Sequence, residues 1–441
     1  MNRLLFLSFF ATILSISVIA QQDSILKDLP KQWTLQACIE YAKQKNITLA
    51  TLRLTQRSTE EDLLQSKAAV LPNLTGTVTQ SLINGNSTVT SGGGLQTSGN
   101  YGVNSSMILY NGGYLKNDIK SKELTVQSAN LNIKETENDL SLTITQTFFN
   151  ILLAKENINS LQSVLITSRE QLKQGQIKYD AGGLARKDLL QLQSQVAADE
   201  YSLVNATNIY KLNLVTLKQI LLLPTIYDFT VSVPDSIPII QAQAKLSEAQ
   251  NEAQQGRPEI QNGQLQVQIA QVELDKIRAF SKPTLSLGGA LSSGYSANQG
   301  YSYVTGLNTN FYQSLGLTLG IPIYSRRVNL TNTNKTKILL DEAKLSLINT
   351  KTILNQLVEQ AFINLQNAEA QYIAADTQLK ANTEIYQITN EQLKLGAVTT
   401  LELLQQKNLY VHALEAFSQA KYSAALYNKI YEFYMGIPLT F

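Results

Sequence analysis

Two acidic residues occupy matching positions in this sequence, each six residues after a glycine. Asp188 follows Gly182 and Glu402 follows Gly396, so one offset of 214 positions relates both pairs. A helix that must reverse within a few residues usually passes through a left-handed position, which glycine tolerates best. The two carboxylates therefore fall in the first turns of departing helices, where the helix dipole favours negative charge. Stabilising the start of a helix is one interpretation of these two carboxylates. Whether they also have a functional role depends on how the fold places them.

Residues for other kinds of chemistry are scarce. The chain contains one cysteine, Cys38, and one histidine, His412. This excludes an internal disulfide framework, a multi-cysteine zinc site and the usual His–His metal signatures. No GxSxG, HExxH, Walker A or CxxC motif occurs. We interpret Cys38 as a buried helix residue and His412 as a packing or surface residue, and the sequence predicts no catalytic site, metal site or cofactor.

The composition is polar but weakly charged. Charged residues make up 16% of the 441 positions and the formal net charge is +2, which gives no reason to expect a nucleic-acid partner. The length allows one large domain or two to three ordinary ones. Gln, Asn, Ser and Thr are abundant, which is typical of walls that face water on both sides.

Residues 1–20 have the pattern of a secretory signal peptide. Arg3 contributes to a positive start, residues 4–14 form an apolar core, and a sequence resembling a cleavage site precedes Gln21. The core is too short for a spanning helix, and no later stretch of about 18 apolar residues occurs. We therefore expect a mature chain outside the cytoplasm without a transmembrane helix.

Periodicity divides the mature chain into two tandem halves of the same order. Each half is predicted to contain a helix, two strands joined by a polar loop, a very long helix, a glycine turn and a returning helix. The predicted segments are repeat 1 at 21–230, a linker with a short helix at 231–257, and repeat 2 at 258–441. The predicted strands are 72–83, 101–110, 283–292 and 312–324, the long helices 114–174 and 325–395, and the turns 182–183 and 396.

The predicted strands alternate apolar with small or polar residues. In the clearest of them, Leu315, Leu317 and Leu319 alternate in this way, which is the weak signature of an outer-membrane β-barrel strand. Four strands cannot close a barrel, and an open sheet would leave unpaired edges in lipid. The chain is therefore expected to oligomerise, and two, three or four copies would give 8, 12 or 16 strands.

These features resemble the TolC family of outer-membrane efflux proteins, over about residues 33–439. The most specific match is the duplicated turn Y-x-x-G-x-x-x-x-x-D-L-L and its copy, and the opening WTLQACIEYAKQKN and the strand entry L-P-N-L also match. The resemblance implies a mixed α and β membrane protein, a homotrimer whose 12-stranded β-barrel lies in the outer membrane of a Gram-negative bacterium and continues as a long α-helical periplasmic barrel. It also implies a passive export channel whose partners are outer-membrane lipid, a periplasmic adaptor and an inner-membrane pump.

The resemblance also assigns roles to single residues. Carboxylates and neighbouring polar groups would ring a narrow pore, and the pore-constriction candidates are Asp188, Glu402, Gln405 and Tyr179. The candidates for adaptor contact are the turn residues Gly182, Gly183, Leu184, Gly396, Ala397 and Val398.

The chain departs from the family pattern at three positions near the second turn. Leu393 stands where an aromatic residue is common, and Val398 stands where an arginine can occur. Gln405 stands where a second acidic residue can occur. These departures leave open whether the turns carry a polar latch between helices and a second acidic ring.

Two other classes of protein fit parts of the sequence. A secreted or periplasmic helical rod or adaptor without a pore fits the signal peptide and the long helices, but it has no use for an apolar stripe on the strands. A periplasmic or surface enzyme would need a catalytic constellation, which the motifs do not supply. The sequence does not identify an exported substrate.

Overall fold

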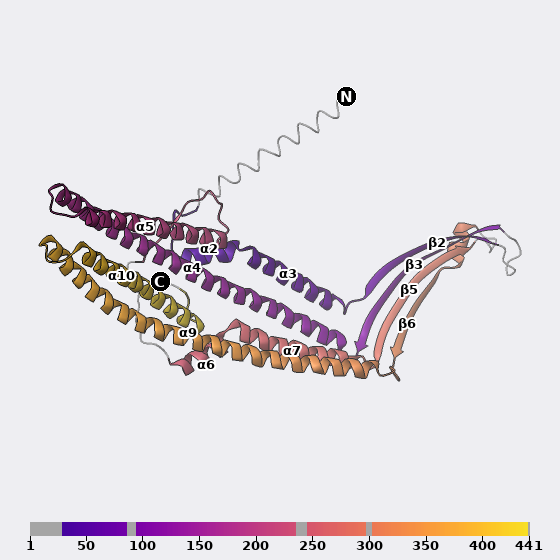
Figure 1. Ribbon diagram of the computed structural model, residues 1–441. Coiled ribbons are helices and arrows are strands. Elements are labelled where there is room, and N and C mark those ends of the chain that lie inside the picture. The colour runs from indigo at the N-terminus through magenta and orange to yellow at the C-terminus, as the bar shows by residue number, and fades with distance from the viewer. Residues whose placement is uncertain (1–28, 86–93, 235–244, 297–301, 440–441) are drawn as a thin grey trace, which may run out of the picture. The chain divides into compact units, whose positions relative to one another are not determined.

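The computed structural model describes residues 29–85, 94–234, 245–296 and 302–439 (Figure 1). The predicted signal peptide lies outside the described residues. The chain forms two compact units. Unit 1 comprises the described residues up to Thr51, Lys134–Arg257 and those from Thr352 onward, and unit 2 comprises Leu52–Ile133 and Pro258–Lys351. The units cut across the two predicted halves, because each unit takes segments from both.

Unit 2 contains a four-stranded antiparallel sheet in the order β2-β3-β5-β6 (Figure 1). The strands are β2 (Asn73–Gly85), β3 (Gly94–Asn111), β5 (Thr284–Ser296) and β6 (Tyr312–Gly320). At one end of the sheet, Asn111 pairs with Thr284 and Thr284 pairs with Gly320. Within the described chain, β2 and β6 each keep one edge without a partner strand.

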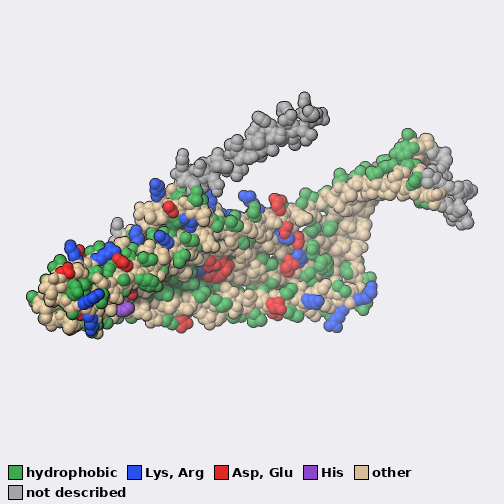
Figure 2. Space-filling model, turned by 45° about the horizontal axis from the view of Figure 1, so that its top comes forward, with side chains coloured by type: hydrophobic (Ala, Val, Ile, Leu, Met, Phe, Trp, Pro, Cys, Tyr) green, Lys and Arg blue, Asp and Glu red, His purple; other side chains and the backbone are tan. Residues whose placement is uncertain are grey.

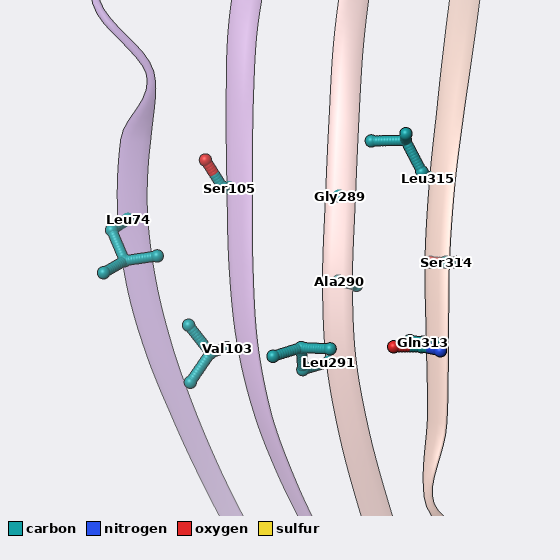
Figure 3. Close-up of a pocket in the computed structure, with 9 residues that line it drawn as sticks. All are labelled: Leu74, Val103, Ser105, Gly289, Ala290, Leu291, Gln313, Ser314 and Leu315. Carbon is teal, nitrogen blue, oxygen red and sulfur yellow. The ribbon is translucent and has the colours of Figure 1, made fainter.

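The two faces of the sheet differ in character. One face carries Leu74, Val103, Leu291 and Leu315, one from each strand, and Leu74 and Leu315 are 77% and 79% exposed (Figure 3). The residues between them on each strand are mainly Ser, Thr, Asn and Gly. Exposed aliphatic patches of this extent require cover by another apolar phase or surface.

The helices of unit 2 join one another through polar side chains. The unit contains most of α3 (Ile47–Ala68), all of α7 (Pro258–Ala279) and parts of α4 (Tyr114–Asp180) and α9 (Val328–Lys394). On α4, Ser121 Oγ donates to Glu273 at 2.7 Å and Ser128 Oγ donates to Asn262 at 2.7 Å. The contacts between these helices therefore include hydrogen bonds between polar side chains.

Unit 1 contains the main apolar core. It packs α2 (Leu35–Lys45) and part of α4 against α5 (Arg186–Ile220) and α10 (Thr400–Tyr434). A two-residue parallel pair, β1 (Gln32–Trp33) with β4 (Thr230–Val231), closes one side, and α6 (Leu246–Gly256) also belongs to this unit. Buried aromatic residues include Trp33, Phe148 and Phe149. Thr34 caps α2 and accepts a hydrogen bond from the Ala37 backbone N–H at 3.2 Å.

Cys38 lies fully buried in this core, as predicted. Burial raises the pKa of its thiol to about 12, against the smaller opposing effect of a backbone hydrogen bond. The thiolate is the nucleophile, so we expect iodoacetamide at about pH 8 to leave Cys38 unmodified in the folded protein and to alkylate it in denaturant. Mass spectrometry measures both, and equal rates in the two states would contradict the buried placement.

The corresponding elements of the two halves have equal lengths. Both α4 and α9 have 67 residues, α5 and α10 have 35, and α3 and α7 have 22. At 1.5 Å per residue the longest helices measure roughly 100 Å. A tandem duplication of the two halves stays a prediction.

Several element boundaries differ from the predicted ones. Helix α4 continues through Gly175 to Asp180, because an α-carbon without a side chain lets Leu192 of α5 approach closely. Strand β6 ends at Gly320 and not at residue 324, since Pro322 has no N–H to donate to a ladder. The predicted loop after β5 contains a short helix, α8 (Tyr303–Thr309), whose N-cap is Ser302.

Candidate functional site at the hairpin turns

Both helical hairpins of unit 1 reverse through a left-handed glycine, as predicted. Gly182 has φ +76° after α4 and Gly396 has φ +75° after α9. The next backbone N–H reaches five residues back in each case, from Gly183 to Lys178 O at 2.7 Å and from Ala397 to Gln392 O at 2.9 Å. This is the Schellman arrangement, which satisfies carbonyls that the helix leaves unpaired.

Asp188 and Glu402 lie in the first turns of α5 and α10, as predicted from their spacing. The backbone N–H of Glu402 donates to Thr399 Oγ1 at 3.2 Å, so Thr399 caps α10. Ala185 provides no such side-chain cap for α5. Asp188 is the acidic residue in the first turn of this helix, where the helix dipole favours its negative charge.

The other predicted site residues surround these turns. Gln405 is exposed on α10, and Tyr179 is half-buried near the end of α4. Of the six turn candidates for adaptor contact, Leu184 and Val398 are half-buried and the rest are exposed. A constriction at Asp188 and Glu402 remains a prediction, because a pore would require several copies of the chain.

A small cavity of about 50 Å³ lies between the two hairpins close to the turns, and residues of both hairpins line it. Its wall includes Gln171 and Leu184 from the first hairpin and Asn390, Leu393 and Thr400 from the second. Leu393, which departs from the family pattern, therefore lies against the neighbouring hairpin. The two hairpins of one chain are in contact at this level.

A buried ion pair joins the hairpins beyond this cavity. The Lys407 ammonium on α10 donates to the Asp199 carboxylate on α5 and to Ser168 Oγ on α4. Lys407 is 1% exposed and Asp199 is 7% exposed. Gln195 Nε2 also donates to Asp199, at 2.9 Å. Burial lowers the pKa of Lys407 below its ordinary value, while the ion pair with Asp199 acts in the opposite direction.

A second polar contact links the same hairpins. Gln171 Nε2 on α4 donates to Tyr386 Oη and to Asn390 Oδ1 on α9, both at 3.0 Å. The Tyr386 ring stacks on Tyr410 of α10 with 5.3 Å between ring centroids. Together with the Lys407 contacts, these bonds connect all four helices of the two hairpins.

Lys407, Asp199 and Ser168 are not among the site residues predicted from the sequence. A signal for the two charged residues exists in the sequence, because both interrupt apolar stripes at helical spacing. Asp199 continues the buried series Leu189, Leu192 and Val196 on α5, and Lys407 follows buried Leu403 by one helical turn on α10. A charged residue at such a position is almost never fully buried unless it is paired.

A model of the family described as outer membrane efflux protein matches residues 38–221 and 249–427. The chain belongs to this family. The matched segments include the four strands, both hairpin turns, the first hairpin and the second hairpin up to residue 427. The predicted resemblance is confirmed.

Individual family members are similar at low identity. The chain is 22% identical over 441 residues to outer membrane efflux protein BepC of Brucella suis, covering 94% of this chain and 87% of BepC. It is 23% identical over 202 residues to outer membrane protein TolC of Salmonella enteritidis, covering 43% of this chain and 40% of TolC. The match thus spans less than half the length of TolC.

Solved structures share the fold. The structure is similar to CusC, described as forming a transmembrane channel, with TM-score 0.81 and 17% identity over 92% of both chains. It is also similar to the open state of the outer membrane channel MtrE of Neisseria gonorrhoeae, with TM-score 0.78 and 19% identity over 92% of this chain and 89% of that one.

Family membership establishes the location of the protein. It is an outer-membrane protein of a Gram-negative bacterium with a periplasmic extension. The family and the structural neighbours are channels and not enzymes. Within the described residues, no helix combines the length and the apolarity that crossing a membrane demands.

Proposed function

We propose that three copies of this chain form a passive export channel through the outer membrane. The observation that carries the proposal is the sheet of unit 2, which has two unpaired edge strands and an exposed aliphatic face in a chain of the efflux family. Backbone groups at open edges are not tolerated in lipid. Pairing β2 of one copy with β6 of the next would satisfy both edges and give a closed 12-stranded barrel.

The hairpin turns are the proposed narrow end of this channel, with Asp188, Glu402, Gln405 and Tyr179 as constriction candidates. A trimer would bring up to six carboxylates of Asp188 and Glu402 around one axis, and such rings favour cations. The buried Lys407–Asp199 pair supports motion of the two hairpins of one protomer as a single body. Opening would then separate neighbouring protomers before it separates hairpins within one.

The proposed partners are a periplasmic adaptor and an inner-membrane pump, which supplies the energy. Gly182, Gly183, Gly396 and Ala397 are exposed at the turns and are available for adaptor contact.

The mass of the detergent-solubilised mature protein and its conductance in a planar bilayer test the channel. We expect a trimer with a small, cation-selective conductance. A monomer or dimer that stays soluble without detergent and shows no conductance would exclude the channel and favour the alternative of a periplasmic helical rod.

The double variant Asp188→Asn with Glu402→Gln is expected to move the cation-to-anion permeability ratio toward unity without preventing assembly. Both changes keep the side-chain volume and remove up to six charges per trimer from the proposed constriction. Reversal potentials under a salt gradient measure the ratio, and an unchanged ratio would remove Asp188 and Glu402 from the constriction.

A matched control uses the same helices. Glu200→Gln and Glu415→Gln remove exposed carboxylates from α5 and α10, roughly 18–20 Å beyond the acidic residues at the turns, at 1.5 Å per residue. We expect this variant to keep the wild-type permeability ratio. If both variants changed the permeability ratio equally, the selectivity would arise from the charge of the helices in general and not from carboxylates at the constriction.

A further inference from the structure

The charged residues that lie nearest to the sheet of unit 2, at the end where its strands join the helices, are all basic. We call this end of the sheet its helical end. The first charged residues flanking the strand pairs are Lys67, Lys116, Lys282 and Arg326, and Arg327 follows directly. No Asp, Glu, Lys, Arg or His occurs at positions 68–115 or 283–325. On the face that it shows, Figure 2 has neither red nor blue side chains over the sheet and has blue ones where the strands meet the helices. We call Lys67, Lys116, Lys282, Arg326 and Arg327 the basic collar, and all five are exposed.

The collar differs from the charged residues further along the same helices. There, Lys122 pairs with Asp62 at 2.9 Å and Lys276 pairs with Asp118 at 3.2 Å. Within residues 29–85, 94–234, 245–296 and 302–439, no carboxylate lies within ion-pairing distance of any collar residue. The collar therefore presents cations whose counter-ions are not supplied by the described chain.

The backbone does not account for the residue types in the turn directly before α9. Arg326 and Arg327 have φ values of 46° and 68°, a left-handed conformation that glycine or asparagine adopts at lower cost. Backbone bonds hold this turn, from Val328 N to Ser325 O and from Thr331 N to Arg327 O, both at 2.9 Å. Two arginines therefore occupy positions where the backbone conformation favours other residue types.

Close packing places two other collar residues at the same end of the sheet. Gly112 has φ +67°, and a Cβ there would lie 2.7 Å from both Ala279 O and Lys282 Cβ. The Lys282 ammonium donates to the Gly112 carbonyl at 3.3 Å. The connection from β3 to α4 is thereby fixed against the connection from α7 to β5, and Lys116 follows in the first turn of α4.

We propose that the basic collar binds the phosphate groups of anionic phospholipids in the membrane leaflet at the helical end of the sheet. The proposal rests on the insertion of the sheet proposed above. The exposed aliphatic face begins within one residue of this end, at Leu285 and Leu319, so collar cations adjoin the acyl region at headgroup depth. Guanidinium groups bind phosphate through paired hydrogen bonds, and basic residues beside a membrane attract anionic lipid.

The same face offers space for an acyl chain. Ser105 and Gly289 leave a groove of about 530 Å³ between the larger side chains of Leu74, Leu291 and Leu315 (Figure 3). Gly289 lies five residues from the start of β5, or roughly 17 Å at 3.3 Å per residue. An acyl chain attached to a headgroup at the collar reaches this groove.

Native mass spectrometry of the full mature protein in detergent tests the proposal. The probes are dioleoylphosphatidylglycerol, dioleoylphosphatidylethanolamine and inorganic phosphate. The variants are Arg326→Gln with Arg327→Gln, and a form in which all five collar residues are Gln. The matched control is Lys335→Gln with Lys337→Gln, which removes two exposed cations from nearby α9.

We expect the wild type to bind phosphatidylglycerol in preference to phosphatidylethanolamine. Removing one collar cation should lower this preference roughly fivefold, which corresponds to about 1 kcal/mol for a basic residue near an anionic surface. The arginine variant should therefore lose most of the preference, the five-site variant should lose all of it, and the control should keep it.

Besides a wild type without lipid preference, three outcomes would overturn the proposal. They are a preference that survives in the five-site variant, an equal loss in the lysine control, and displacement of the lipid by inorganic phosphate at equal concentration. The same spectra report the mass of the assembly. A trimer without lipid preference excludes lipid binding by the collar but leaves the proposed channel standing. A monomer excludes the proposed channel.

Discussion

Replacing Lys407 by methionine is expected to lower the free energy of unfolding by about 3–5 kcal/mol, because it breaks a buried ion pair by removing one partner. Asp199 would keep its hydrogen bonds from Ser168 and Gln195. Its carboxylate would nevertheless stay buried without a counter-ion. Thermal and denaturant unfolding of the detergent-solubilised protein, followed by circular dichroism, measures the loss.

A double variant separates a lost charge partner from lost packing. Lys407→Met with Asp199→Leu replaces the pair by apolar side chains of similar volume, a change that is often neutral or stabilising. We expect it to recover most of the stability that Lys407→Met loses. A double variant as unstable as the single one would show that packing, and not the unpaired carboxylate, causes the loss.

Lys421 provides the control on the same helix. It lies 3.9 Å from Glu156 with more of its side chain exposed than Lys407, and exposed ion pairs contribute at most about 1 kcal/mol. Lys421→Met should therefore change the stability by no more than this. A Lys407→Met effect in the same small range would contradict the burial of the pair.

Leu315→Arg is expected to abolish assembly of the trimer in the outer membrane. Leu315 pairs with Gly289, near the middle of β5, on the aliphatic face of the sheet. An arginine on the lipid face at mid-bilayer costs about 2–4 kcal/mol per strand, and a trimer would contain three of them. Immunodetection of trimer in outer-membrane fractions measures the loss.

Two substitutions on the same strand calibrate this result. Ser314→Arg places the charge on the opposite face, which would line the water-filled lumen, and is expected to be tolerated. Leu319→Arg lies on the aliphatic face but pairs with Leu285 beside the helical end of the sheet, where the cost falls to about 0–1 kcal/mol. If Ser314→Arg were the damaging change, the lipid-facing side of the sheet would be the other one.

Periodicity and glycine placement determine much of the architecture, because they act within one or two helical turns. Gly182 and Gly396 mark both hairpin turns, and the alternation around Leu315 marks a strand. The predicted ends of helices and strands that were wrong depend on contacts with other elements or on a single proline that ends a strand. Gly175 stays helical because Leu192 packs against it, and Pro322 ends β6 before the apolar alternation stops.

By itself, the sequence determined the elements, the turns, the family and the lack of charge across the strands. Only the tertiary structure decided which charged residues are buried and which remain unpaired. Lys407 and Asp199 are 208 positions apart, and local sequence patterns do not predict that their helices pack together. The unpaired state of Arg326 and Arg327 is likewise set in space, because an ion pair depends on which carboxylates the fold brings within reach.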